Sequence, residues 1–202
     1  MNNDIEYSTN QADPEAIAAH LLLCNAAFAP PLSTRVDISA YAQKIHDRAV
    51  RFEAWQDSDL VGLAAYCSDP NEPSAFVTSV SVLPSHQGQG VATVLMRRCL
   101  DHVQHAGLTR IELAVDQRSA SAVALYQKLG FATTRAQGTS LTMSINLTPG
   151  RSSPMKTQRD YDGEIKNTTG HQYAYGFDFD VMHPYMIRSF EPFFRPGSLL
   201  EL

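Results

Sequence analysis

Two glycines, at positions 88 and 90, lie between a strand-like run and a run with helical periodicity. The stretch from residue 82 to 92 reads Val-Leu-Pro-Ser-His-Gln-Gly-Gln-Gly-Val-Ala. Glycine lets the backbone turn sharply and lets its N–H groups come close to a ligand. The first amides of a helix lack intrahelical partners, and the helix dipole favours an anion beside them. This order of strand, turn and helix therefore predicts a cradle for a pyrophosphate group.

The turn does not match the common nucleotide-binding loops. No Gly-Lys-Ser/Thr follows it, so it is not a P-loop, and Thr93 stands where the dinucleotide fingerprint has its third glycine. A strand-to-helix turn that uses glycine only for tightness is the alternative at this point. The strands and helices around the turn help to decide between a pyrophosphate site and a purely structural turn.

Strand and helix patterns alternate along the first 147 residues. Strand patterns rich in β-branched, aromatic and alternating apolar residues cover 5–8, 50–55, 60–66, 76–83, 111–115, 131–135 and 141–145. Helical patterns cover 14–28, 38–45, 91–105 and 119–129, with Asp13, Asp37 and Ser119 as expected N-caps. The order βααβββαβαββ predicts one layered α/β domain.

Two segments resemble the acetyl-CoA signatures of the GNAT N-acetyltransferase family. Gln87-x-x-Gly90-x-Ala92 is similar to the first signature, Gln/Arg-x-x-Gly-x-Gly/Ala. Residues 122–131, Ala-Val-Ala-Leu-Tyr-Gln-Lys-Leu-Gly-Phe, resemble the second, which ends in Leu-Tyr-x-x-x-Gly-Phe. The resemblance covers about residues 3–147. It implies the GNAT fold, a mixed central sheet flanked by helices in which two parallel strands, 76–83 and 111–115, splay apart.

The resemblance also implies acetyl-CoA as cosubstrate. The turn amides would hold the CoA pyrophosphate, and strand backbone would pair with the pantetheine arm as an added strand does. A strand amide beside the acyl carbonyl would stabilise developing negative charge. The implied cofactor-binding residues are Val80, Val82, Gln87, Gly88, Gln89, Gly90, Val91, Ala92, Ser119 and Tyr126.

Tyr126 matches the family tyrosine that protonates the leaving CoA thiolate, so it is the expected catalytic residue. A phenol with an ordinary pKa near 10 is a suitable acid for a thiolate of pKa about 8.5. A packing tyrosine on an amphipathic helix is the alternative. The amine acceptor would attack the thioester directly in a ternary complex, so the family chemistry needs no enzyme nucleophile.

Several side chains depart from the family pattern or leave the general base open. Ser119 replaces the asparagine of the second signature, and we expect it to cap its helix and bond the pantetheine arm with shorter reach. Thr78 stands where many members carry a glutamate base, which leaves a water chain, another residue or an amine that arrives neutral. His86 is expected on an exposed turn. Glu112 lies within the strand 111–115 and Asp116 directly after it, and Glu112 is expected as a solvated surface acid.

The acceptor site is expected over the splayed strands. Phe28, in the loop 28–35, and Thr78 are the expected substrate contacts, with Thr139 nearby. The acceptor class is a primary amine of a small molecule, for which an amino sugar is one suggestion. The rival hypothesis is a non-catalytic CoA-binding module that regulates or scaffolds a methyltransferase.

Composition and net charge argue against some classes of binding partner. The net charge of −5 argues against nucleic-acid binding, and no apolar run reaches the length of a membrane span. Residues 1–4 lack the features of a signal peptide, and Cys24, Cys67 and Cys99 are expected as buried free thiols in a reducing cytoplasm. A homodimer is left open.

The composition of the chain changes after residue 147. We expect an acetyltransferase domain at 1–147, a linker at 148–170 and an aromatic extension at 171–202. The segment 160–202 resembles the approach to the first strand of an S-adenosylmethionine-dependent methyltransferase, ending before the cofactor loop. The acids and histidines of this extension lack metal-ligand spacing, and no metal is expected; they are His171, Asp178, Asp180 and His183.

Overall fold

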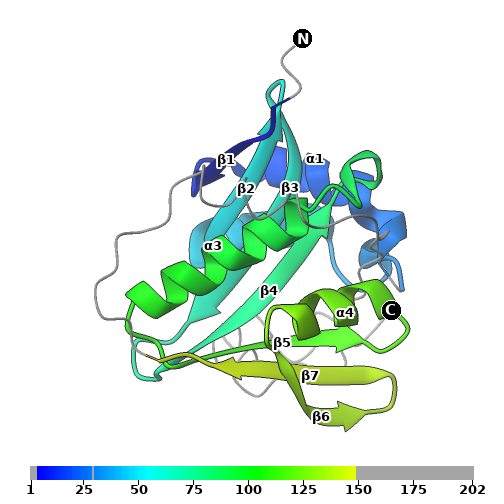
Figure 1. Ribbon diagram of the computed structural model, residues 1–202. Coiled ribbons are helices and arrows are strands. Elements are labelled where there is room, and N and C mark those ends of the chain that lie inside the picture. The colour runs from blue at the N-terminus through cyan, green and yellow to red at the C-terminus, as the bar shows by residue number, and fades with distance from the viewer. Residues whose placement is uncertain (1–3, 29, 149–202) are drawn as a thin grey trace, which may run out of the picture.

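The computed structural model describes residues 4–28 and 30–148, and it is a seven-stranded sheet between two layers of helices (Figure 1). The order of elements along the chain confirms the sequence prediction. The strands are β1 Glu6–Thr9, β2 Val50–Gln56, β3 Asp59–Ser68, β4 Ser74–Val82, β5 Arg110–Asp116, β6 Ala132–Gln137 and β7 Ser140–Asn146. The α-helices are α1 Pro14–Cys24, α2 Ile38–Arg48, α3 Val91–His105 and α4 Ala120–Lys128, and the 3₁₀ turns are η1 Asn25–Ala27, η2 Leu32–Thr34 and η3 Pro84–His86.

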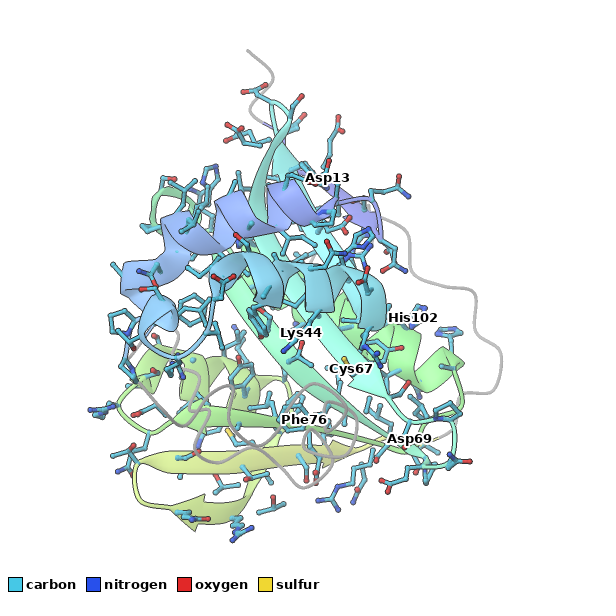
Figure 2. All side chains as sticks on the ribbon, turned by 180° about the vertical axis from the view of Figure 1, so that it is seen from behind. Asp13, Lys44, Cys67, Asp69, Phe76 and His102 are labelled. Carbon is cyan, nitrogen blue, oxygen red and sulfur yellow. The ribbon has the colours of Figure 1, made fainter. Side chains whose placement is uncertain are left out.

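The strands lie side by side in the order β1-β2-β3-β4-β5-β7-β6. Every pairing is antiparallel except that of β4 with β5, which is parallel. That parallel pairing covers only three residue pairs, from Ser74–Arg110 to Phe76–Glu112. Beyond Phe76, which Figure 2 labels, the two strands separate, so the expected splay is present.

Each face of the sheet has its own helices and its own apolar core. The helices α3 and α4 cover the face turned toward the viewer in Figure 1, and α1 and α2 cover the face turned toward the viewer in Figure 2. Leu95, Met96 and Cys99 of α3 are fully buried against one face. Ile17 and Leu21 of α1 are fully buried against the other. The sheet therefore lies between two separately packed helix layers.

The helix starts follow the sequence, but the first helix ends early. Asp13 accepts a hydrogen bond from the Ala16 amide, and Asp37 from the Ala40 amide, each at 2.7 Å, as N-caps do. α1 ends at Cys24 rather than near residue 28. Asn25 then bonds the Ser33 side chain and amide at 3.0 and 2.8 Å, which turns the chain back into a closed loop.

The two acids of β5 are buried, and for Glu112 this contradicts the expectation of a solvated surface acid. Glu112 is 7% exposed and pairs with Arg110, and Asp116 is 1% exposed and accepts hydrogen bonds from Arg118 and Thr139. The reason is the position of β5. It lies inside the sheet between β4 and β7, with side chains covering both of its faces.

The three cysteines are free and buried, as expected, and burial raises the pKa of each thiol. None of the helices within residues 4–28 and 30–148 is long and apolar enough to cross a membrane. In the same ranges no three His, Cys, Asp or Glu side chains are grouped as metal ligands. The expected extension 171–202, the methyltransferase-like segment and all but the first residue of the linker lie outside the described residues.

Candidate active site

The glycine-rich turn leaves β4 through η3 and enters α3 with two left-handed residues. Gly88 has φ 76° and Gly90, the N-cap of α3, has φ 84°. Other residues rarely adopt this conformation. Gly90 brings no side chain to cap the first turn of α3, so the N–H groups of Val91 and Ala92 have no side-chain partner at the cap. The side chains of both residues are buried, and the turn therefore presents backbone to a ligand.

Side chains within the turn brace its shape. Gln87 donates from Nε2 to the Val82 carbonyl oxygen at 3.2 Å, and Gln89 donates from Nε2 to the Ser85 carbonyl oxygen at 3.0 Å. His86 is half-buried rather than exposed, because its Nε2 lies 2.7 Å from Oε1 of Gln56 at the end of β2. The β2–β3 hairpin thus supports the turn from the side.

A bulge interrupts β4 beside the splay. Tyr66 of β3 pairs with Val77, but the preceding residue Ala65 pairs with Ser79, which leaves Thr78 as the extra residue. Thr78 is 2% exposed, and its carbonyl oxygen accepts a 2.8 Å hydrogen bond from the Tyr41 hydroxyl of α2. Because of the bulge, backbone N–H and C=O groups of β4 point in other directions than in a regular strand, at the place where β4 and β5 separate.

A pocket lies in the splay and is reached by residues from both faces of the sheet. Tyr126 comes from α4 on one face, and Phe28 and Tyr41 come from the opposite face. The residues that line it are Phe28, Leu32, Tyr41, Val77, Thr78, Ser79, Val80, Leu113, Ala114 and Tyr126. The structure thus brings together four residues named from sequence and Leu32 of the loop 28–35, which was expected to line the site. It adds Tyr41 and the β5 pair Leu113 and Ala114, whose sequence patterns indicate helix-core or strand positions.

The other residues named from sequence lie next to this pocket along the chain. Val82 ends β4, the residues from 87 to 92 form the turn, and Ser119 precedes α4. Ser119 does not cap α4 with its hydroxyl, contrary to expectation. Its backbone has φ −80° and ψ 62°, and its N–H donates to the Asp116 carbonyl oxygen at 2.9 Å.

Tyr126 is buried, and its ring meets that of Phe131 edge-on, with centroids 5.9 Å apart. Burial raises its pKa, chiefly because the charged phenolate would lose its hydration. Its hydroxyl has no hydrogen-bond partner among the described residues. A protonated hydroxyl at the pocket wall is the form that a general acid needs.

No carboxylate or imidazole lines the pocket within the described part of the chain. The buried histidine nearest to β4 is His20, whose Nδ1 lies 2.8 Å from the Leu60 carbonyl oxygen and whose Nε2 lies 2.8 Å from Ser81 Oγ. Burial lowers its pKa to about 4, so it is neutral at pH 7 with both ring nitrogens engaged. Asp116 is held by Arg118, whose hydrogen bonds lower the Asp116 pKa.

A model of the acetyltransferase (GNAT) family matches residues 18–131, more than half of the chain. The chain belongs to the GNAT family. The matched residues include the C-terminal part of α1, the loop 28–35, the bulged β4, the glycine-rich turn and Tyr126, so the pocket described above lies within the family domain.

Curated relatives match over shorter segments. Streptothricin acetyltransferase of Streptomyces lavendulae is 33% identical over 76 residues, which are 38% of this chain and 40% of the relative. The [ribosomal protein bS18]-alanine N-acetyltransferase of Escherichia coli K12 is 28% identical over 91 residues, or 45% of this chain and 60% of the relative. Mycothiol acetyltransferase of Renibacterium salmoninarum is 43% identical over 53 residues, or 26% and 16%. The matched part is thus less than two thirds of each.

Solved structures share the fold at low identity. The ribosomal-protein-S18-alanine N-acetyltransferase of Escherichia coli superposes with a TM-score of 0.59 at 19% identity, covering 74% of this chain and 99% of that chain. The structure of yncA from Salmonella typhimurium, a protein described with its cofactor acetyl-CoA, has a TM-score of 0.59 at 20% identity, covering 74% and 98%. These likenesses establish the GNAT fold for the described domain.

Proposed function

We propose that this chain is an N-acetyltransferase that moves the acetyl group of acetyl-CoA to a primary amine of a small molecule. The observation that carries the proposal is the pocket in the splay, which side chains reach from both faces of the sheet. Acetyl-CoA would enter on the α3–α4 face and the amine on the α1–α2 face. The two substrates then meet in the opening between β4 and β5, as a ternary complex requires.

The glycine-rich turn would hold the CoA pyrophosphate with the amides around Gly88, Gly90 and Ala92. The backbone of β4 at Val80 and Val82, no longer paired with β5, would bind the pantetheine amides. Ser119, whose hydroxyl is not used as a helix cap, would reach the same arm. The group transferred thus lies beside Thr78 and Tyr126.

In the reaction, the amine nitrogen attacks the thioester carbon and forms the amide bond while the carbon–sulfur bond breaks. The Tyr126 hydroxyl gives its proton to the leaving thiolate of CoA. The amine loses one proton to water, because the described pocket wall offers only neutral side chains, and water returns a proton to the Tyr126 phenolate. An ammonium ion is disfavoured in such a wall, so the acceptor reacts as the neutral amine.

The relatives' names guide the choice of acceptors. Two are named for small molecules, streptothricin and mycothiol, and a third for an alanine of a ribosomal protein. We therefore favour a small-molecule amine, for which an amino sugar stays one candidate, and we keep a peptide α-amine as a comparison.

The test is release of free CoA from acetyl-CoA in the presence of an amine panel, at several pH values. We expect turnover with at least one amine, and an acid limb of kcat/KM that follows the pKa of whichever amine is used. Acetyl-CoA binding without turnover for any amine would favour the rival hypothesis, a non-catalytic CoA-binding module. An acid limb at one fixed pH for all amines would instead indicate an enzyme base.

A further inference from the structure

The Tyr41 side chain, from helix α2, reaches the bulge in β4. The Tyr41 hydroxyl donates to the Thr78 carbonyl oxygen at 2.8 Å, and both residues are at least nine-tenths buried and line the pocket. Thr78 is the residue that the register of β3 and β4 skips. Its carbonyl therefore depends on a partner outside the β3–β4 ladder, and a buried carbonyl without one is costly.

The direction of this carbonyl has a consequence for the neighbouring amide. The peptide group between Thr78 and Ser79 is planar, so a hydrogen bond that fixes the carbonyl also fixes the N–H. Stabilisation of an oxyanion depends on N–H groups that already point at the place where the charge develops. Along β4, the pocket wall from Val77 to Val80 is the segment whose backbone borders the splay.

Tyr41 is suited to hold this geometry. Its ring belongs to the apolar cluster under α1 and α2, and burial raises its pKa, so the hydroxyl keeps the proton that it donates. The α2 helix that carries it begins at Ile38, directly after the acceptor-side loop that contributes Phe28 and Leu32 to the pocket. Tyr41 thus links the acceptor side of the pocket to the strand on the thioester side.

We propose that Tyr41 is a positioning residue for acetyl transfer: its hydroxyl fixes the bulged peptide of β4 so that a backbone N–H faces the thioester oxygen. This inference rests on the proposed function. It assigns to Tyr41 an effect on the chemical step and on recognition of the acetyl group, and none on binding of the CoA pyrophosphate.

The experiment compares Tyr41→Phe with Tyr66→Phe. Tyr66 is the control because the residue is also buried, its hydroxyl lies 2.8 Å from Nδ1 of His102 on the α3 side in a partly buried hydrogen bond (Figure 2 labels His102), and it does not line the pocket. For each protein we would measure kcat, KM for the amine, the melting temperature, and Kd for CoA and acetyl-CoA by calorimetry.

We expect Tyr41→Phe to lower kcat about 10- to 100-fold, the effect of a misdirected oxyanion donor. Its Kd for CoA should stay within about twofold, and its preference for acetyl-CoA over CoA should shrink. Tyr66→Phe should lower the melting temperature by a similar amount and keep the wild-type kcat and preference. An unchanged kcat in Tyr41→Phe, or an equal loss in both variants, would overturn the inference.

Two further outcomes are informative. If wild-type protein turns over no amine, the proposed function fails, while the acetyl-CoA to CoA preference still tests Tyr41. If Tyr41→Phe does not fold, 4-aminophenylalanine at position 41 replaces the hydroxyl with a weaker donor. An intermediate kcat with an unchanged Kd for CoA would then support the inference, and a wild-type kcat would contradict it.

Discussion

At the scale of single residues, the environment of Tyr126 decides its chemistry. A buried phenol with no hydrogen-bond partner among the described residues keeps its proton well above neutral pH. Tyr126→Phe removes only the hydroxyl and keeps the edge contact with Phe131. We expect kcat to fall roughly 100-fold, the usual size of general acid catalysis, with Kd for CoA nearly unchanged. Steady-state kinetics and calorimetry measure the two quantities. Unchanged turnover with every accepted amine would remove Tyr126 from the chemistry.

The sequence predicted part of this site and missed the rest for a physical reason. Tyr126, Thr78 and Phe28 were predicted because their motifs or loop mark them. The bulge was missed, although the sequence carries a signal of it. Val80 and Val82 share one face of β4 at the regular spacing of two, but Val77, on the same face, lies three residues before Val80. Such a slip in alternation indicates an extra residue.

At the scale of elements, the cradle depends on backbone conformations that only glycine adopts readily. Gly88→Ala places a methyl group on a residue with φ 76°, which costs about 1–2 kcal/mol in that conformation. If the turn shifts to relieve this strain, Kd for acetyl-CoA should rise about tenfold, the equivalent of 1.4 kcal/mol. Gly138→Ala is the matched control, because Gly138 has φ 58° in the β6–β7 turn with open space around it. It should lower stability and leave Kd unchanged.

The close packing of α3 on the sheet is a second feature at the scale of elements. A Cβ atom at Gly62 of β3 would lie 2.9 Å from Cγ1 of Val91 and 3.0 Å from Cδ1 of Leu95. Gly62→Ala should therefore cost about 1–3 kcal/mol of unfolding free energy, the usual effect of overpacking. Because Val91 begins α3, Kd for acetyl-CoA should rise as well. Urea unfolding and calorimetry test both, and unchanged values would show that α3 moves away without loss.

The order of elements was predictable because proline, glycine and N-cap residues mark where each one begins or ends. The splay was implied by the family resemblance and not by the strand patterns, since both 76–83 and 111–115 continue past the point where their pairing ends. The exposure of Glu112 was predicted wrongly, because alternation within one strand does not indicate that the strand lies inside the sheet.

At the scale of the whole domain, His20 makes stability depend on pH. Its pKa is about 4 in the folded protein, because burial disfavours the charged ring, and near 6.5 when unfolded. The unfolded chain therefore binds the proton more readily. Neutral His20 contributes up to about 3 kcal/mol to the free energy of unfolding. This contribution is fully present above pH 6.5 and is lost as the pH falls toward 4.

His20→Gln removes this titration while keeping groups that can bond the Leu60 carbonyl and Ser81 hydroxyl. We expect its unfolding free energy to change less with pH than that of the wild type between pH 6.5 and 4. Urea unfolding at half-unit pH steps provides the comparison. Parallel curves for the two proteins would assign the pH dependence to other groups.

The sheet has two outer edges, at β1 and β6, and an internal opening where β4 and β5 separate. These places differ in whether another strand can pair with them. β1 is only four residues long, and β6 is exposed throughout, with a register shift between Thr133 and Arg135 and a positive charge on the latter. Short, bulged and charged edges discourage pairing with a strand from another protein. The unpaired length of β4 and β5 lies between two helix layers. The fold therefore keeps its capacity to add a strand inside the domain, in an opening that a slender, extended chain such as the pantetheine arm would fill.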